Sequence, residues 1–266
     1  MSEIEIDLRK SLNENASGYF ERSKKAKKKL EGILRTMPLM EKKLERDKAS
    51  IEGTGIGKLR KKRRKEWYEK FHWFFTSDGM LAIAGKDAKG NDALVKKHME
   101  KTDIYFHAEI HGAPHTVLKS KDNTAPPQSM QEAAEFAGAF SSAWKQKLSS
   151  VDVYSVLPEQ VSKSAPTGES MGAGAFMIYG KRQWFRKATV RLAIGFDNKT
   201  SRVVSGPEDA IRKTTSAYVA VSQGDIQKGE FAKKIKKELE FRVQAKNIVE
   251  IDEILSMLPA GGFDIG

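Results

Sequence analysis

Cationic side chains and aromatic rings adjoin each other near residue 65 of this chain. Residues 58–65 (KLRKKRRK) contain seven Lys or Arg, and the segment 67–92 (WYEKFHWFFTSDGMLAIAGKDAKGND) follows with its aromatic residues grouped at the start. Lys and Arg neutralise phosphates while aromatic rings stack on bases, so this pairing is typical of binding to RNA or single-stranded nucleic acid. The competing interpretation is that the basic run is a solvated helix face and that the rings belong to the core.

The positive charge of the chain is concentrated in its first quarter. The 266 residues carry 47 Lys and Arg against 35 Asp and Glu, a net charge of +12. Residues 1–66 hold twenty basic and eleven acidic side chains, which accounts for +9 of that total. The chain therefore combines a basic arm with a nearly neutral domain, and we expect its partner to be nucleic acid or an anionic membrane surface.

Composition excludes several functional classes. The absence of Cys excludes disulfides, thiol catalysis and thiolate metal sites. The sequence has no run of about eighteen apolar residues, no segment that resembles a signal peptide, and no lipidation motif. We therefore expect a cytoplasmic protein with no membrane partner.

The first 65 residues are predicted to form a basic helical hairpin. Ser11 and Glu14 have the spacing of a capping box at a helix start. Apolar residues then recur as a heptad seam, which Pro38 should interrupt or kink and which the glycines of 53–57 should end. Residues from 58 onward can return as a second helix, and the seam could close within one chain or between two chains as a dimer. The seam consists of Leu12, Ala16, Tyr19, Ser23, Ala26, Leu30, Ile33, Met37, Met40 and Leu44.

Like charges crowd the outer face of the predicted first helix. Residues 22–29 (RSKKAKKK) contain six Lys or Arg, whereas a purely structural coiled coil normally alternates the sign of its charges. The local repulsion favours contact with a polyanion over a merely solvated face. The candidate phosphate contacts on the hairpin are Lys24, Lys25, Lys28, Lys58, Arg60, Lys61, Arg63 and Arg64.

Residues 66–266 are predicted to form an α+β domain. Strands are broken by single helices without regular alternation, which favours a mixed sheet over a doubly wound one. We expect strands at 72–76, 80–84, 151–157, 175–179, 190–196 and 217–221, and helices at 92–101, 130–148, 230–241 and 251–258. The first two strands flank Ser77-Asp78-Gly79 and should form a hairpin.

The segment 103–111 (DIYFHAEIH) alternates apolar and polar residues, as expected for a strand with one polar face. His107 and His111 would lie on that face with two carboxylates, close enough to share a metal ion or to act as an acid–base pair. A metal site needs a third ligand, and no spacing nominates one beyond a guess at Asp87. A polar surface that faces RNA, or a hydrogen-bonded structural surface, is the favoured interpretation.

The glycine-rich loop 166–174 (PTGESMGAG) does not match a nucleotide-binding pattern, because it lacks both the Walker order and the G-x-G-x-x-G spacing. Two interpretations stay open. The loop amides and Lys163 could meet a sugar–phosphate backbone, or the glycines could serve only a tight connection before the next strand.

Four ordered blocks resemble the RNA-binding domain called NFACT-R, found in ribosome quality-control proteins long described as fibronectin-binding protein A homologues. These blocks are 67–88, 103–112, 160–169 (QVSKSAPTGE) and 174–181 (GAFMIYGK). The C-terminal 251–262 (IDEILSMLPAGG) resembles the end of archaeal members. The resemblance also implies that 1–65 corresponds to the family's coiled-coil middle region.

The resemblance implies a binding function without catalysis, cofactor or metal. It identifies further candidate RNA contacts, and family members often have Arg at the position of Lys86, so that the bidentate fork is lost here. The implied partners are large-subunit rRNA and the peptidyl-tRNA of stalled ribosomes. The alternatives are a metal-dependent RNA-processing enzyme that uses His107 and His111, or a coiled-coil scaffold for proteins. The candidate contacts in the domain are Lys86, Asp87, Asn91, His107, His111, Gly112, Gln160, Ser162, Lys163, Thr167, Gly168 and Lys181.

In the family, a further N-terminal domain and a helix-hairpin-helix region take part in recruiting charged tRNA and tailing the nascent chain. Neither is recognised in this sequence. We therefore expect a fragment, or a short form that retains binding without tailing.

Overall fold

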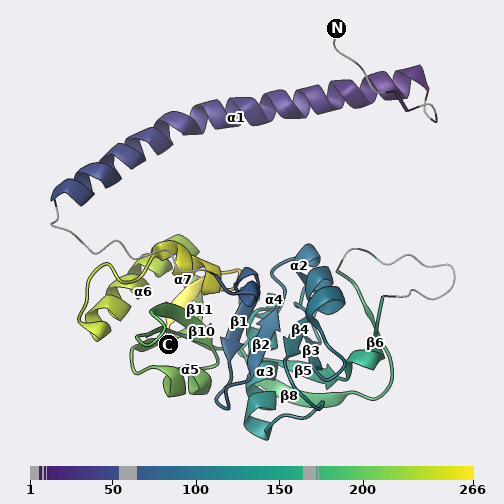
Figure 1. Cartoon of the computed structure of the whole chain (residues 1–266), viewed down its shortest axis with the longest axis vertical. Coiled ribbons are helices and arrows are strands. Elements are labelled where there is room, and N and C mark those ends of the chain that lie inside the picture. Colours follow the sequence, from purple (N-terminus) through teal and green to yellow (C-terminus); the bar gives the residue numbers. More distant parts are fainter. Residues whose placement is uncertain (1–5, 8, 10, 54–64, 164–171, 173) are drawn as a thin grey trace. The chain divides into compact units, whose positions relative to one another are not determined.

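The chain divides into two compact units, Met1–Arg63 and Arg64–Gly266. The computed structural model describes residues 6–7, 9, 11–53, 65–163, 172 and 174–266, with 43–53 described by their backbone alone (Figure 1). Helices are mixed with antiparallel sheets in the second unit, so the predicted α+β class is confirmed. No helix in the described ranges is long and apolar enough to cross a bilayer.

The first unit contains one long helix, α1 (Leu12–Gly53). Its predicted capping box is present, since the Ser11 amide donates to Glu14 Oε2 at 2.8 Å and the Glu14 amide donates to Ser11 Oγ at 3.3 Å. The helix passes through Pro38 without ending, so of the two predicted effects, an interruption or a kink, the interruption does not occur (Figure 1). Every described side chain of the heptad seam is exposed. The predicted return helix begins at residue 58 and falls on 54–64, outside the described residues.

A six-stranded antiparallel sheet forms the first layer of the second unit. Its strand order is β1-β2-β4-β3-β5-β8, and the predicted hairpin of the first two strands is confirmed, with His72 opposite Ala84. The strands are β1 (His72–Phe75), β2 (Leu81–Ala84), β3 (Ile104–Ala108), β4 (Thr116–Leu118), β5 (Ser150–Val156) and β8 (Gln183–Thr189).

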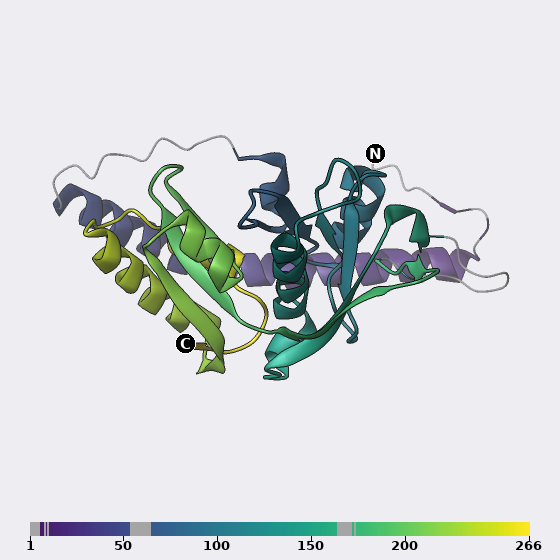
Figure 2. The same cartoon turned by 90° about the horizontal axis from the view of Figure 1, so that it is seen from below.

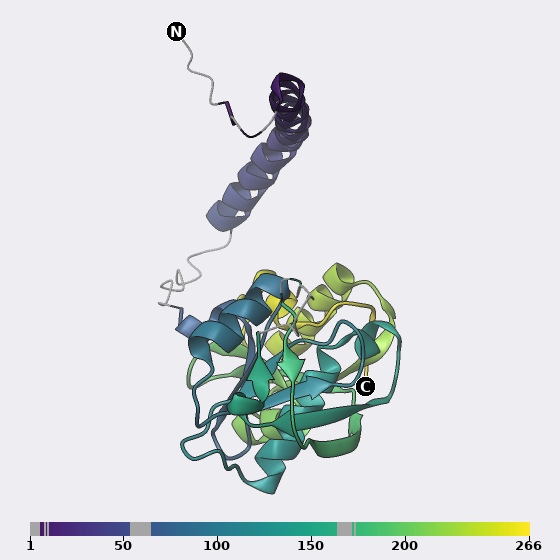
Figure 3. The same cartoon turned by 90° about the vertical axis from the view of Figure 1, so that its right-hand side faces the viewer.

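A second sheet of four strands follows, with the order β10-β9-β11-β12. Figure 2 shows this sheet, in green, beside the six-stranded sheet, in teal. The strands are β9 (Leu192–Asp197), β10 (Arg202–Gly206), β11 (Tyr218–Ile226) and β12 (Phe263–Ile265). A small pair, β6 (Val161–Ser162) and β7 (Met177–Ile178), lies on the side of the unit that faces the viewer in Figure 3.

Helices cover both sheets. The predicted helix 130–148 is broken into α3 (Pro127–Ala139) and α4 (Ser142–Lys145), because Ser141 Oγ accepts from the Ala143 amide at 3.1 Å and starts a new helix. The helix expected at 92–101 is instead α2 (Ala88–Ala93) followed by a π-helical turn (Leu94–His98). The remaining helices are α5 (Glu208–Thr214), α6 (Lys228–Val243) and α7 (Ile251–Met257), with 3-10 turns at Trp67–Lys70 and Pro158–Gln160.

One apolar core joins the two sheets, and most of the aromatic segment contributes to it. Tyr68, Phe71, Trp73 and Phe74 are buried, so the core interpretation is right for these four rings. Trp67 is 44% exposed and stacks on His98 with ring centroids 4.6 Å apart. The helix α3 packs against β3, β5 and β8 and closes one face of the first sheet.

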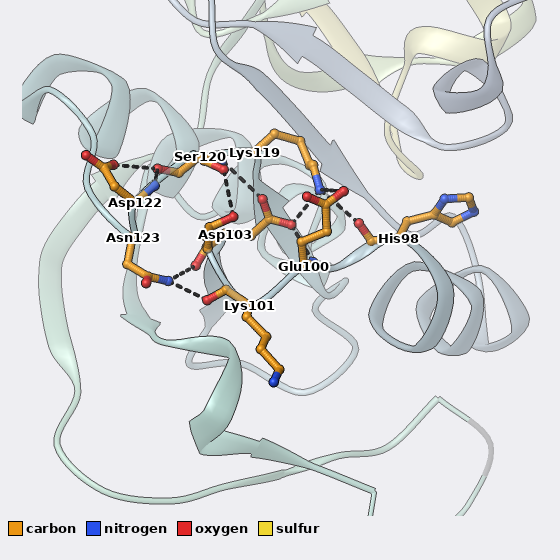
Figure 4. Close-up of polar contacts among 9 residues, drawn as sticks. His98, Glu100, Lys101, Asp103, Lys119, Ser120, Asp122 and Asn123 are labelled. Carbon is orange, nitrogen blue, oxygen red and sulfur yellow. Dashed lines mark hydrogen bonds and ion pairs between the residues drawn. The ribbon is translucent and has the colours of Figure 1, made fainter.

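A buried carboxylate fixes the start of β3. Asp103 accepts hydrogen bonds from the amides of Glu100 at 2.7 Å and Ser120 at 3.1 Å, and from Lys119 Nζ at 2.7 Å (Figure 4). Lys119 also contacts Glu100 Oε1 at 3.1 Å. Because Asp103 is fully buried, this network compensates its charge and holds β3 and β4 together at one end.

Candidate nucleic-acid interface

A cleft of about 660 Å³ opens on the second unit where several of its loops meet. The loop after β2, the loop after β3, the segment 174–176 and the C-terminal Pro259–Ala260 line it, with His72 and Phe140 also in its wall. This convergence brings together six residues that are separated in the sequence and that were predicted as RNA contacts. They are Lys86, Asp87, Asn91, His107, His111 and Gly112.

Two of these six residues build the loop after β2. Asp87 Oδ1 accepts from the Gly90 amide at 2.6 Å and caps α2. Asn91 Oδ1 accepts from the His115 amide at 3.1 Å and so ties α2 to β4. Gly85 is required there, since a Cβ on it would lie 2.0 Å from Asn91 Oδ1. Asp87 and Asn91 therefore shape the cleft through contacts within the protein.

The loop after β3 presents His111 and Gly112 at the surface. Both residues are exposed, and Gly112 has a φ of +78°, which favours glycine at this position. Ser142 Oγ donates to the His111 carbonyl oxygen at 2.6 Å, so α4 anchors the loop while the imidazole of His111 stays accessible.

The prediction that 103–111 exposes a polar face is wrong, because most of this face is covered. Only Ile104–Ala108 is strand, Asp103 is buried before it, and Tyr105 is buried on the same face as His107. Tyr105 belongs to a second small cluster with Tyr154 and Val156 of the neighbouring strand, and Val161, Phe176 and Ile178 pack against this cluster. Burial, followed by the charge of His115, lowers the pKa of His107 to about 4, so its imidazole is neutral near pH 7.

His115 links the strand face to the glycine-rich loop. Its Nε2 lies 2.7 Å from the Gly174 carbonyl oxygen and must donate to it, which leaves Nδ1 to accept from the Tyr105 hydroxyl. Burial lowers the pKa of His115, and its hydrogen bond to Gly174 partly opposes that shift. The imidazole is thus a neutral structural bridge.

Lys163 uses its donors within the protein. Its Nζ lies 3.1 Å from Asp92 Oδ1 and 3.0 Å from each of the carbonyl oxygens of Gly172 and Ala175. The same ammonium lies 4.8 Å from the centre of the Phe176 ring. The structure therefore gives Lys163 the position of a clamp on the segment around Gly174.

Positive charge gathers at the mouth of the cleft. Lys86 is exposed at the rim, and desolvation, then the charges of Lys228 and Lys65, lower its pKa. Lys65 is the last residue of the basic run found in the sequence. Among the described residues, no carboxylate forms an ion pair with Lys86. The ammonium of Lys86 is thus free of an ion pair within the described residues, although the exposed Asp87 lines the same cleft.

A second, smaller cleft of about 420 Å³ includes Gln160 and Lys181. Gln160 Nε2 donates to the carbonyl oxygens of Tyr179 at 2.7 Å and Lys181 at 3.0 Å, so its amide organises the loop. Ser162 lies in β6, opposite Met177. Lys181 is exposed.

Sequence reasoning missed two cations, of which Arg182 lines this second cleft and Arg186 lies further along β8. The guanidinium of Arg182 lies 4.4 Å from the Tyr154 ring centre, and that of Arg186 lies 4.2 Å from the Trp184 ring centre. The alternation of Arg182, Trp184 and Arg186 was visible as period-two spacing, but β8 was not among the predicted strands.

The remaining predicted contacts lie elsewhere. Lys24, Lys25 and Lys28 are exposed on α1. In the parts of the chain that the structure describes, no three His, Asp or Glu side chains come together to hold a metal ion. The other predicted contacts fall outside the described residues; they are Lys58, Arg60, Lys61, Arg63, Arg64, Thr167 and Gly168.

The cleft falls largely within a recognised domain. The family model of the NFACT protein RNA binding domain matches residues 70–180, which include both loops of the cleft and the whole glycine-rich segment 166–174. This part of the chain is therefore an NFACT RNA-binding domain, and the resemblance seen in the sequence is confirmed.

Similarity to curated proteins extends beyond the matched domain. The archaeal Rqc2 homolog aRqcH of Methanocaldococcus jannaschii is 36% identical over 212 residues, which cover 78% of this chain and 31% of that protein. The ribosome quality control complex subunit NEMF of Homo sapiens is 33% identical over 187 residues, covering 68% of this chain and 17% of that protein. The Drosophila melanogaster NEMF homolog is 35% identical over 186 residues, covering 68% and 18%. The chain thus spans less than a third of each of these relatives.

Proposed function

We propose that this chain is the RNA-binding part of a ribosome quality-control factor that acts in the cytoplasm. The observation that carries the proposal is the cleft, in which six predicted contacts from two separate parts of the sequence meet inside an NFACT RNA-binding domain, with Lys86 at the rim. The relatives are named as ribosome quality-control proteins, which supports the assignment to that process.

Charge supports RNA as the ligand. Lys86 stands at the cleft rim without a carboxylate partner among the described residues, and the charges of Lys65 and Lys228 reinforce it. Lys24, Lys25 and Lys28 add an exposed cationic row on α1. Phosphate contacts from such lysines supply affinity that depends on salt. The partners in this proposal are large-subunit rRNA and the peptidyl-tRNA of a stalled ribosome.

The proposed role is binding without catalysis. The imidazole of His107 lies beside the rings of Tyr105 and Tyr154, and that of His115 bridges Tyr105 and Gly174. His111 is exposed, and among the described residues no carboxylate is hydrogen-bonded to any of these three imidazoles, as an acid–base pair would require.

The exposed heptad seam of α1 supports pairing with another helix. Leu30 is 55% exposed and Met40 is 71% exposed, although both occupy seam positions. Burial against a second helix, from the same chain or from a second copy, would remove this apolar surface from water.

Crosslinking in cells, with sequencing of the attached RNA, tests the proposal. We expect large-subunit rRNA and tRNA to be enriched over their background abundance, and the enrichment to fall when Lys86 is replaced by Ala. Recovery of scattered mRNA, without enrichment of rRNA or tRNA, would overturn the ribosomal assignment.

A further inference from the structure

We infer that the cleft holds a single unstacked nucleotide of RNA, with its phosphate at Lys86 and its base against His72 and Phe140. This inference rests on the proposed function and states which part of the RNA the domain recognises. It is carried by four features of the cleft: its volume, the uncompensated charge at its rim, the state of His72, and its C-terminal wall.

The cleft has the size and form of a ligand site. Its volume of about 660 Å³ lies within the range of roughly 300–1,000 Å³ that is usual for small-molecule sites. Its wall includes the ring of Phe140, whose centroid lies 4.1 Å from that of His72 at an interplanar angle of 31°. Bases in a duplex are stacked inside the helix, so a concave site with an aromatic wall selects a base that has left the stack.

The rim of the cleft supplies the phosphate contact. Lys86 is exposed there, while the half-buried Lys228 and the exposed Lys65 contribute positive charge to the same place. Like charges gathered without an ion-pair partner repel one another, and an anion between them relieves that repulsion. A phosphodiester is the anion that RNA offers.

His72 supplies a neutral polar group for the base. Its Nδ1 is buried and has no hydrogen-bond partner among the described residues. Burial, followed by the charges of Lys86 and Lys228, lowers the pKa of His72 to about 3, so the ring is neutral near pH 7. A neutral imidazole offers one donor and one acceptor, as the edges of bases do. The unsatisfied nitrogen thus favours a base at this position.

The C-terminal segment completes the site from a distant part of the sequence. Lys228 Nζ donates to the Leu258 carbonyl oxygen at 2.9 Å, and Trp144 Nε1 donates to that of Gly262 at 3.0 Å. These two bonds hold Pro259 and Ala260 against the cleft. This part of the wall lies outside the matched range 70–180, so the proposed pocket also needs the C-terminal segment.

The test compares ligands and variants on the full chain. A short single-stranded RNA, a blunt RNA duplex and a mixture of the four nucleoside 5′-monophosphates are titrated by fluorescence anisotropy or by competition. We expect the single strand to bind more tightly than the duplex and the monophosphates to displace it. Lys86→Ala and His72→Phe should each weaken single-strand binding about tenfold, the loss expected for a charged or buried hydrogen bond.

Lys101→Ala is the matched control, because Lys101 is an exposed lysine whose side chain points away from the polar network in Figure 4. It should leave the affinity unchanged, and Lys86→Arg should restore most of the binding. The melting temperature of each variant reports whether folding is intact. If His72→Phe does not fold, two measurements still test the inference. They are the RNA affinity of Lys86→Ala, which changes an exposed side chain, and the displacement of RNA by monophosphates.

The outcomes separate this inference from the proposed function. Absence of binding to any RNA would overturn both. Equal binding of single strand and duplex, unaffected by Lys86→Ala and not displaced by monophosphates, would overturn the nucleotide pocket and leave RNA binding standing. Monophosphate binding that single-stranded RNA does not displace would make a free nucleotide, and not RNA, the ligand.

Discussion

His115 Nε2 donates to the carbonyl oxygen of Gly174 across 59 residues of sequence, at a distance of 2.7 Å. This bond joins the start of β4 to the end of the glycine-rich loop and places Gly174 in the wall of the cleft. We expect His115→Phe, which keeps the ring but removes the donor, to weaken single-stranded RNA binding several-fold by releasing this wall. Anisotropy titration checks the affinity, and an unchanged affinity would show that the bond does not shape the site.

Lys163 should act as a clamp on the same wall. Removing its ammonium in Lys163→Met frees the carbonyl oxygens of Gly172 and Ala175, at a cost of about 1 kcal/mol in local stability. The amide of Gly174, which donates to Asp92 Oδ1 at 3.1 Å, should then exchange its hydrogen faster. Exchange rates measured by mass spectrometry test this, with amides of α6 as the internal reference. Unchanged protection at Gly174 would argue for a direct role of Lys163 in RNA contact.

Stability should decline in mild acid because of the buried histidines. The unfolded chain protonates His107 near its ordinary pKa of 6.5, whereas the folded protein does so only near pH 4. The stabilisation from this group is therefore complete above pH 6.5 and is lost as the pH falls to about 4, by up to about 3 kcal/mol. Urea unfolding at several pH values gives the free energy of unfolding as a function of pH. Between pH 6.5 and pH 4 this free energy should fall less steeply for His107→Asn than for the unchanged protein. An equally steep fall in both proteins would show that His107 does not cause the loss of stability.

Two carboxylates that contact one lysine should differ sharply in their effect on stability. Asp103 is fully buried and accepts two amides as well as Lys119, so Asp103→Ala should reduce the free energy of unfolding by about 3 kcal/mol. Glu100 contacts the same lysine through a side chain that is 71% exposed, and Glu100→Ala should cost less than about 1 kcal/mol. Similar losses in the two variants, measured by urea unfolding, would show that burial does not govern this network.

The elements that depend on local spacing were predictable from the sequence. The capping box at Ser11 and the hairpin around Ser77-Asp78-Gly79 each follow from residues that are neighbours in the chain. The break between α3 and α4 also had a local signal, because Ser141 is a favoured helix cap, but the apolar periodicity of 130–148 concealed it.

The cover over β3 was not predictable in the same way. The alternation in 103–111 is real, yet the second face is buried by Tyr154 and by residues near β6 and β7 that lie about fifty to seventy positions further along the chain. The cleft likewise combines residues that are far apart in the sequence. The family resemblance identified Lys86 and His111, whereas His72, Lys228 and Pro259 join them only through the tertiary fold.

The salt dependence of RNA affinity decides whether this chain binds RNA through its lysines. We predict that the affinity of the full chain for a short single-stranded RNA falls linearly on a log–log scale, with a slope of about −0.7 for each phosphate contacted. Replacing Lys24, Lys25 and Lys28 together by Ala should make the slope shallower, while Lys→Arg changes at the same positions should preserve it. An affinity that does not change with salt concentration would contradict the account.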